Sequence, residues 1–151
     1  MMARKSEIVG MKELERAFRE LGKVPQTAAT QSARAGGRIA LKTAKALAPV
    51  DTGELREGII MKRERSRVKG KAVYDVMMDP GMNDVFVKIS KDGKRYYYPA
   101  SQEYGFLTVD GGYVPGYRFL RRAIDDNKTV IEKKVLETAG KAVDKALRKG
   151  R

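Results

Sequence analysis

The residues with the clearest chemical potential are three carboxylates, Asp51, Glu54 and Glu57, which follow Pro49 where a predicted helix gives way to a predicted strand. Carboxylates that converge on one point can bind a divalent cation or exchange a proton with a substrate. These three surround turn residues, however, and carboxylates at such places commonly cap and solvate the turn. We therefore expect turn geometry, not a metal or acid-base site, to explain them.

The composition excludes most enzyme classes. The chain has no cysteine and no histidine, so a thiolate or imidazole metal site, a Cys-His pair and a Ser-His-Asp triad are all impossible. A nuclease or hydrolase that uses carboxylates alone would need two acids in one pocket, and the best remaining candidates are Asp75, Asp79 and Asp84. Their spacing does not favour such a pocket. We expect a protein without catalytic residues, cofactor or metal.

The charge of the chain points to polyanions or to an acidic protein neighbour. The 32 Lys and Arg outnumber the 19 Asp and Glu, which gives a formal net charge of +13. Six basic residues lie within one segment of ten, opposed only by Glu64: Lys62, Arg63, Arg65, Arg67, Lys69 and Lys71. A strand with basic residues on both faces cannot be covered by a core. Two interpretations stay open, a sequence-independent contact with nucleic-acid phosphates and an edge ribbon kept soluble by its charge.

The 151 residues suit one domain, which we expect to have an α+β fold. The predicted order is N-terminal helices over residues 8–48, one of them long and alanine-rich, then an antiparallel β-meander of about four strands over residues 55–105, a glycine-rich loop over residues 106–116 and a long amphipathic helix over residues 117–149. Apolar stretches are too short for a membrane span, and the first residues lack the apolar region of a signal peptide. Synthesis in the cytoplasm is the expected default.

The N-terminal segment shows two helical patterns, one that Gly22 is expected to end and one from Pro25 to Ala48. The second has an apolar stripe made mainly of alanine, so another backbone can approach it closely. Packing against the first helix or the sheet and contact with another subunit are both open interpretations. Gly36 and Gly37 in its middle are candidate positions for a kink.

Most aromatic residues gather near the glycine-rich segment: Tyr96, Tyr97, Tyr98, Tyr104, Phe106, Tyr113, Tyr117 and Phe119. Stacking on single-stranded bases is one interpretation, and anchoring a core or an interface is the other. The glycine-rich loop is not followed by the Gly-Lys-Ser or Gly-Lys-Thr of a nucleotide-binding loop, so we expect an exposed contact loop.

Three motifs occur in a recognisable order, namely Ala48-Pro49-Val50-Asp51-Thr52-Gly53-Glu54-Leu55, then Tyr98-Pro99-Ala100-Ser101-Gln102-Glu103-Tyr104-Gly105, then Pro115-Gly116-Tyr117-Arg118-Phe119-Leu120-Arg121-Arg122-Ala123. Together they resemble the tail-completion and head-tail joining (neck) family of tailed bacteriophages and prophages. The resemblance runs from about Met11 to Ala146. The chain departs from the family pattern at Arg118 and Arg122, where the family has prolines, and at Phe106, where it has threonine.

The resemblance implies a virion structural protein without catalysis, present in the host cytoplasm during assembly. Such a protein forms a ring, expected to be a hexamer, that joins the portal side of the capsid to the tail tube around the DNA channel. Its partners would be copies of itself, a head-tail adaptor, the tail tube protein and, through the basic run, packaged double-stranded DNA, with no membrane involved. The residues expected to carry the architecture are Pro49, Asp51, Thr52, Gly53, Leu55, Glu103, Tyr104, Gly105 and Phe119. The alternative is a stand-alone basic nucleic-acid-binding protein, which would bind DNA as a monomer in a salt-dependent way.

Overall fold

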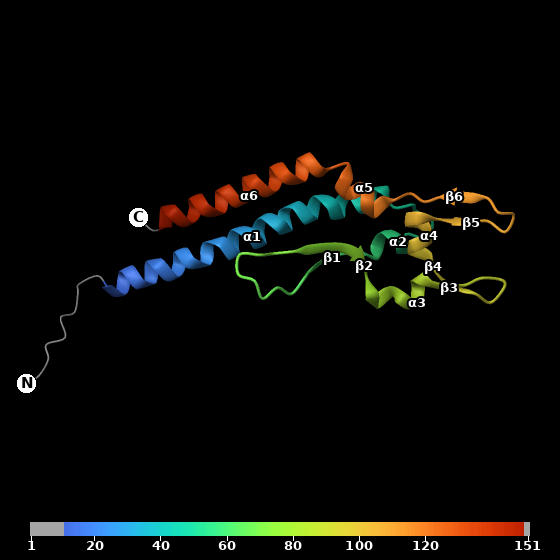
Figure 1. Cartoon of the computed structure of the whole chain (residues 1–151), viewed down its shortest axis with the longest axis horizontal. Helices are drawn as coiled ribbons and strands as arrows, with labels where there is room; N and C mark the ends of the chain where they lie inside the picture. Colours follow the sequence, from blue (N-terminus) through green and yellow to red (C-terminus); the bar gives the residue numbers. More distant parts are fainter. Residues whose placement is uncertain (1–10, 150–151) are drawn as a thin grey trace, which may run out of the picture.

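Two long antiparallel helices and three small hairpins make up an elongated molecule (Figure 1). The structure is a computed structural model, and it describes residues 11–149. The elements in chain order are α1 (Met11–Leu47), α2 (Glu54–Glu57), β1 (Ile59–Arg63), β2 (Tyr74–Met78), the 3-10 helix η1 (Pro80–Met82), α3 (Asn83–Phe86), β3 (Val87–Ile89), β4 (Arg95–Tyr97), α4 (Tyr98–Tyr104), β5 (Gly105–Leu107), β6 (Tyr113–Pro115), α5 (Phe119–Asp125) and α6 (Lys128–Lys149). This confirms the predicted α+β class, with a long helix near each end of the sequence. No described helix is long and apolar enough to cross a membrane.

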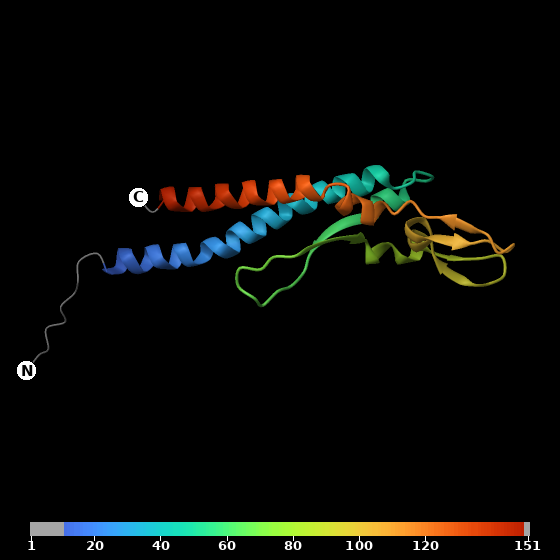
Figure 2. The same cartoon turned by 45° about the horizontal axis from the view of Figure 1, so that its top comes forward.

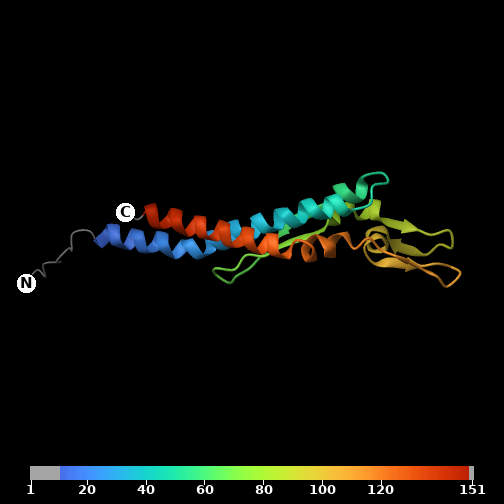
Figure 3. The ribbon, with the colours of Figure 1, turned by 90° about the horizontal axis from the view of Figure 1, so that it is seen from above.

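Helix α1 is the central element, because α6 packs along one side of it and the β1–β2 hairpin along another (Figures 1 and 3). Small residues permit both contacts. A Cβ atom added to Gly36 would lie 2.9 Å from Val135 of α6, and one added to Gly37 would lie 2.7 Å from the sulfur of Met61 in β1. Adjacent glycines thus face two different neighbours. The predicted small-residue stripe is covered within the chain itself, and α1 runs without a break through both glycines.

The prediction that Gly22 ends a first helix is wrong, because α1 continues through both Gly22 and Pro25 (Figure 2). Gly22 does not adopt the positive φ with which glycine terminates a helix. Pro25 removes one backbone donor, but this part of the helix is held from outside. The Gln26 side chain donates to the Lys71 carbonyl at 3.2 Å and accepts from the Gly70 N–H at 2.9 Å. Residues 8–10 of the predicted helical segment lie outside the described residues.

The strands form three separate antiparallel pairs, β1–β2, β3–β4 and β5–β6, and not one meander. Short helices interrupt the chain between the pairs, so no ladder extends beyond two strands in the described part of the chain. Val85 and Phe86, which alternation predicts to be the first residues of a strand, belong instead to α3, and residues 98–104 of the predicted meander form α4. The dipeptide Asp92-Gly93, a common sequence signal for a hairpin, lies in the turn between β3 and β4, with Gly93 at a φ of 78°.

Two further segments differ from the prediction in detail. The glycine-rich segment is a hairpin and not an irregular loop, closed by a turn in which Gly111 has a φ of 81° and donates to the Thr108 carbonyl at 3.0 Å. The long C-terminal helix is split into α5 and α6. At the split, the Asn127 amide donates to the Ala123 carbonyl at 3.0 Å and to the Thr43 hydroxyl at 3.1 Å, which fixes the joint against α1.

The main core lies where α1, α2, the β1–β2 hairpin, α3 and α5 meet. We call this region the junction, and its buried apolar residues are Ala44, Ala48, Leu55, Ile59, Met78, Phe86, Phe119 and Ala123. Phe86 and Phe119 are the largest of the fully buried side chains in it. All of the described residues of α6, by contrast, keep part of their surface exposed. The junction therefore holds the short elements in place while the long helices extend away from it.

Candidate interaction surfaces

The first motif forms the turn that leads from α1 into the junction. Gly53 has a φ of 86° and caps α2, and its carbonyl accepts the Glu57 N–H at 3.0 Å. Leu55 is 3% exposed and belongs to the core, whereas Asp51 and Thr52 are exposed. Pro49 follows the last turn of α1, where a missing N–H costs no helical hydrogen bond. The placement of these residues accords with a role in shaping the turn.

The candidate carboxylates do not gather into a site. Within residues 11–149, no group of three or more acidic side chains is arranged to hold a metal ion. Asp51 and Glu54 line a pocket of about 180 Å³ together with Lys88 and Tyr98, while Glu57 is not among its lining residues. Burial, with Asp51 as the next cause, raises the pKa of the Tyr98 hydroxyl above the ordinary value of 10.0.

The second acidic set, Asp75, Asp79 and Asp84, is also dispersed. Asp79 accepts the Gly81 N–H at 2.8 Å and so caps η1. Asp75 lies opposite Lys62 in the β1–β2 hairpin, and Asp84 is exposed in the first turn of α3. These positions are those of local capping and solvated residues, which gives a carboxylate-based active site no support.

The second and third motifs meet through Glu103. Its buried carboxylate accepts the Leu120 N–H at 2.9 Å and the Arg121 N–H at 3.1 Å, so a side chain from α4 caps the first turn of α5. Phe119, the first residue of α5, is fully buried in the junction. Gly105 lies directly against the β6 backbone, because a Cβ atom there would overlap the Val114 carbonyl oxygen. Tyr104 is 69% exposed and therefore does not pack in the core.

The departure from the family motif at Arg118 has a structural counterpart. Arg118 adopts a φ of 51°, and its N–H donates to the Glu103 carbonyl at 3.0 Å. Proline has a fixed φ near −65° and no N–H, so proline could satisfy neither requirement. At this position the chain uses a backbone conformation that proline could not adopt.

The predicted basic run lies on the β1–β2 hairpin and on the loop that joins its strands. We call its six cations, Lys62, Arg63, Arg65, Arg67, Lys69 and Lys71, the basic loop, and all six are exposed. The loop does not project freely, because Gln26 binds its far end and the Arg63 guanidinium donates to Thr30 at 3.3 Å. Its charges are held beside α1.

A second basic surface, which the sequence interpretation missed, lies on α1 itself. Arg34, Arg38, Lys42 and Lys45 recur at helical spacing; the first three are exposed and Lys45 is half-buried. We call them the α1 stripe. None of them forms an ion pair with another residue in the described part of the chain. The sequence does contain a signal for the α1 stripe, because no acidic residue occurs between Leu21 and Val50 and all charged residues of this stretch are therefore cations.

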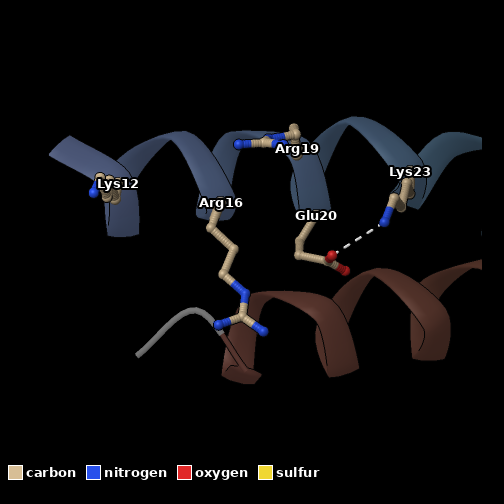
Figure 4. A pocket seen from close by; sticks show the side chains of 5 residues that line it. All are labelled: Lys12, Arg16, Arg19, Glu20 and Lys23. Atoms are coloured by element: carbon tan, nitrogen blue, oxygen red, sulfur yellow. Dashed lines mark hydrogen bonds and ion pairs between the residues drawn. The ribbon is translucent and has the colours of Figure 1, made fainter.

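A third group of charged side chains lies near the start of α1 (Figure 4). Lys12, Arg16, Arg19, Glu20 and Lys23 line an open cavity of about 550 Å³. Lys23 pairs with Glu20 at 3.1 Å, and the Arg16 side chain points toward the end of α6. The excess of cations extends the basic character of α1 toward its first turns.

Two hairpins project from the end of the molecule opposite the end of α6 (Figures 1 and 3). The β5–β6 hairpin, which we call the apolar arm, exposes large apolar side chains: Tyr104, Phe106, Leu107, Val109, Tyr113, Val114 and Tyr117. The β3–β4 hairpin, which we call the basic arm, exposes Ile89 and Tyr96 among four cations, Lys88, Lys91, Lys94 and Arg95. Exposed apolar area of this extent marks an interaction surface. The aromatic residues thus fall into two groups: Phe119 is buried in the core, whereas Tyr104, Phe106, Tyr113 and Tyr117 are exposed.

Comparison with known proteins defines the class to which this arrangement belongs. Residues 12–96, which extend from α1 to β4 and make up more than half of the chain, match a family of bacteriophage tail components. It is the HK97-gp10-like family, described by gp10 of bacteriophage HK97, and the chain belongs to it. The predicted membership of a phage tail-protein family is thereby confirmed, on a match that includes the first of the three motifs and ends before the other two. No curated protein and no solved structure matches the chain.

Family membership supports a structural role in the phage particle, where the partners of a tail component are other phage tail and neck proteins. It also implies a location in the virion.

Proposed function

We propose that this chain is a ring-forming subunit of the phage neck, a tail-completion or head-tail connector protein that joins the portal side of the capsid to the tail tube. The observation that carries the proposal is its membership of a phage tail-component family. In this proposal the chain has no catalytic role. Its partners are copies of itself, a head-tail adaptor and the tail tube protein, and it resides in the host cytoplasm until assembly.

The elongated shape supports this proposal. The exposed apolar arm at one end and the long paired helices at the other give each subunit two different ends. Contacts between unlike surfaces of identical subunits generate rings when the rotation closes. A hexamer is the state that the motifs imply. Eight of the nine motif residues act architecturally, by shaping the α1–α2 turn, by tying α4 to α5 or by packing in the junction, and the ninth, Tyr104, belongs to the exposed apolar arm. Together they lie within what we propose is a single domain.

Loss of the gene provides the direct test. Inactivating it in the phage genome that encodes it should leave filled heads and finished tails that do not join, as seen by electron microscopy, and the wild-type gene supplied in trans should restore joining. Normal particles without the gene product would contradict a neck role. A protein that stays a monomer by light scattering and binds DNA tightly, while particles form without it, would support the stand-alone nucleic-acid-binding alternative.

We also propose that the ring contacts packaged DNA through phosphates, using the α1 stripe and the basic loop. Support comes from the cations that these two neighbouring surfaces present, with no acid on α1 after Glu20. Such binding is independent of sequence. Each phosphate that the protein neutralises adds about 0.9 to the magnitude of the slope of log K against log salt.

Duplex binding by the purified protein at several salt concentrations tests this part. Changing Arg34, Arg38, Lys42 and Lys45 together to Gln should lower the magnitude of the slope by up to about 3.6. The matched control changes four exposed lysines of α6, Lys128, Lys133, Lys134 and Lys145, and should leave the slope nearly unaltered. Equal effects of the two variants would mean that net charge, and not the α1 stripe, determines binding.

A further inference from the structure

The α1 stripe and the basic loop follow one another along α1. Thr30, whose hydroxyl binds the Arg63 guanidinium, lies four residues before Arg34, and residues four apart are neighbours on a helix. Gln26, which binds the far end of the loop, lies four residues before Thr30. Figure 1 shows the loop beside this part of α1. The two sets of cations therefore form one surface, which we call the basic track.

The basic track has a defined length. Gln26 and Lys45 are 19 positions apart in an unbroken helix, which corresponds to about 29 Å at a rise of about 1.5 Å per residue. The charged residue that follows Lys45 in the chain is Asp51. At the other end, Lys23 is paired with Glu20 at 3.1 Å. Carboxylates thus occur just beyond both ends of the track.

The charges of the basic track are not neutralised within the described chain. The track has ten cations, four from the α1 stripe and six from the basic loop, and the one acid in these two segments is Glu64. Asp75 lies opposite Lys62 in the hairpin register. None of the ten cations forms an ion pair with a described residue. Close, exposed like charges repel one another, and a polyanion removes that repulsion.

The length and the charge of the track match a short piece of duplex DNA. About 29 Å of duplex contains about nine base pairs and about 17 phosphates, and about half of these face one side. This is close to the ten cations. DNA is straight over such a length, because its persistence length is about 150 base pairs. A duplex lying along α1 reaches both sets of cations, whereas one crossing α1 reaches only the stripe or only the loop.

The surroundings of the track favour a duplex over a single strand. Proteins that bind single strands commonly stack the bases on aromatic side chains. Residues 26–45 and 62–71 contain no Phe, Tyr or Trp. The exposed aromatic side chains lie instead on the arms, among them Tyr104, Phe106 and Tyr113. The track therefore offers contacts to phosphates and no platform for bases.

We infer that the basic track is a single site for one DNA duplex, which lies lengthwise along α1 and occupies about nine base pairs. The inference rests on the proposed contact with packaged DNA. It adds the path of the duplex, the length that each chain covers and the preference for double-stranded DNA.

The first test measures binding of the purified full-length protein to DNA stem-loops whose stems range from about five to about sixteen base pairs. The magnitude of the slope of log K against log salt should rise with stem length up to about nine base pairs and then stay constant. A constant slope from about five base pairs onward would mean that the duplex crosses α1. Two short stems bound per chain would mean that the stripe and the loop are separate sites. Either result would overturn the inference.

A loop variant makes the test specific. Arg65→Gln/Arg67→Gln/Lys69→Gln should lower the slope magnitude by up to about 2.7 on a stem of about twelve base pairs. On a stem of about five base pairs it should have little effect, because the intact α1 stripe, about 17 Å long, covers that stem alone. The variant changes only exposed side chains.

The matched control, Lys88→Gln/Lys91→Gln/Lys94→Gln, removes the same charge from the exposed basic arm and should have little effect on either stem. A loop effect that is equal on both stems, or a control effect as large as that of the loop variant, would contradict a single lengthwise site.

Two further outcomes separate this inference from other partners and from the neck role. A single strand of the stem sequence, or a polyglutamate peptide of the same charge, that binds as tightly as the long stem would show that the track does not select duplex DNA. No binding to any stem-loop would overturn both the inference and the proposed DNA contact. The neck role would be unaffected by either result, because it is tested by inactivating the gene and examining the particles.

Discussion

Apolar side chains are buried at the junction but exposed in the two arms. At the junction, Ile59, Phe119 and Ala123 are each 0% exposed, whereas in the arms Ile89, Leu107 and Val109 are 74%, 77% and 101% exposed. Apolar burial is the main favourable term in folding, so the junction supplies much of the stability that the isolated chain has. These exposed side chains of the arms gain almost nothing from folding, whereas Tyr97, at the base of the basic arm, packs against the junction. The comparison indicates that apolar side chains stabilise the fold at the junction, whereas in the arms they are available to a binding partner.

The strongest test of this comparison is a matched pair of phenylalanine substitutions. Phe119→Ala should lower the free energy of unfolding by about 3–5 kcal/mol, because it removes a fully buried ring and leaves a cavity. Phe106→Ala, on the apolar arm, should change it by less than about 1 kcal/mol while reducing assembly. Urea denaturation followed by circular dichroism measures both. Equal decreases would mean that the arm is part of the folding core.

A second test concerns the carboxylate that ties the arms to the junction. Glu103→Ala leaves two N–H groups of α5 without their acceptor and should cost about 1–3 kcal/mol in unfolding free energy. Glu103→Gln keeps one oxygen and should cost less. Asp125→Ala is the control, since its exposed carboxylate pairs with Arg121 at the surface, and its unfolding midpoint should stay close to that of the parent protein. Identical midpoints for the alanine variants at 103 and 125 would disprove the capping role.

The long helices allow a sharper comparison between a packed and an open glycine. Gly140→Ala should stabilise the protein by up to about 1 kcal/mol, because alanine favours helix and nothing lies within 4 Å of the added methyl group. Gly36→Ala should destabilise it or at best be neutral, since its methyl group would meet Val135 at 2.9 Å and valine is stiff within a helix. Thermal unfolding of the two variants gives opposite signs if α1 and α6 pack as described.

The smallest expected effect is a pH dependence at the edge of the junction. Burial raises the pKa of Tyr97 and of Tyr98 in the folded protein, and Asp51 adds to the rise at Tyr98. The unfolded chain therefore loses these protons first as pH increases, and stability that is complete below about pH 10 falls above it. Tyr98→Phe should make the fall shallower. An unfolding midpoint equally sensitive to pH in the variant would assign the effect to other groups.

Much of the fold could be predicted from local sequence signals. The apolar period of α6, the end of α1 before Pro49 and the turn at Asp92-Gly93 are properties of short segments, and all are present. The continuity of α1 through Gly22 and Pro25 was not predictable in this way, because it coincides with contacts to Gly70 and Lys71, far along the chain. Strand pairing also depends on residues far apart in the sequence. The alternation of apolar and polar residues therefore could not predict that the strands form three separate hairpins.

The candidate surfaces were predictable to a smaller degree. The dense basic run from Lys62 to Lys71 can be recognised directly in the sequence. The α1 stripe can be recognised only once the segment is known to be one helix, because only then do Arg34 and Lys45 lie on the same face. The buried position of Phe119 and the capping by Glu103 join residues from different motifs. The family resemblance implied that these residues share an architectural role, but it did not predict the hydrogen bonds from the Leu120 and Arg121 N–H groups to Glu103.

The two side-chain joints at Glu103 and Asn127 together have a mechanical consequence. Glu103 fastens the arms to α5, and Asn127 fastens the start of α6 to Thr43 of α1, so the path from the arms to the last helix is tied at both of its ends. A pull applied at an arm is carried through hydrogen bonds into the helical pair. In a ring in which each subunit holds the next, tension from the tail would be shared around the whole circumference.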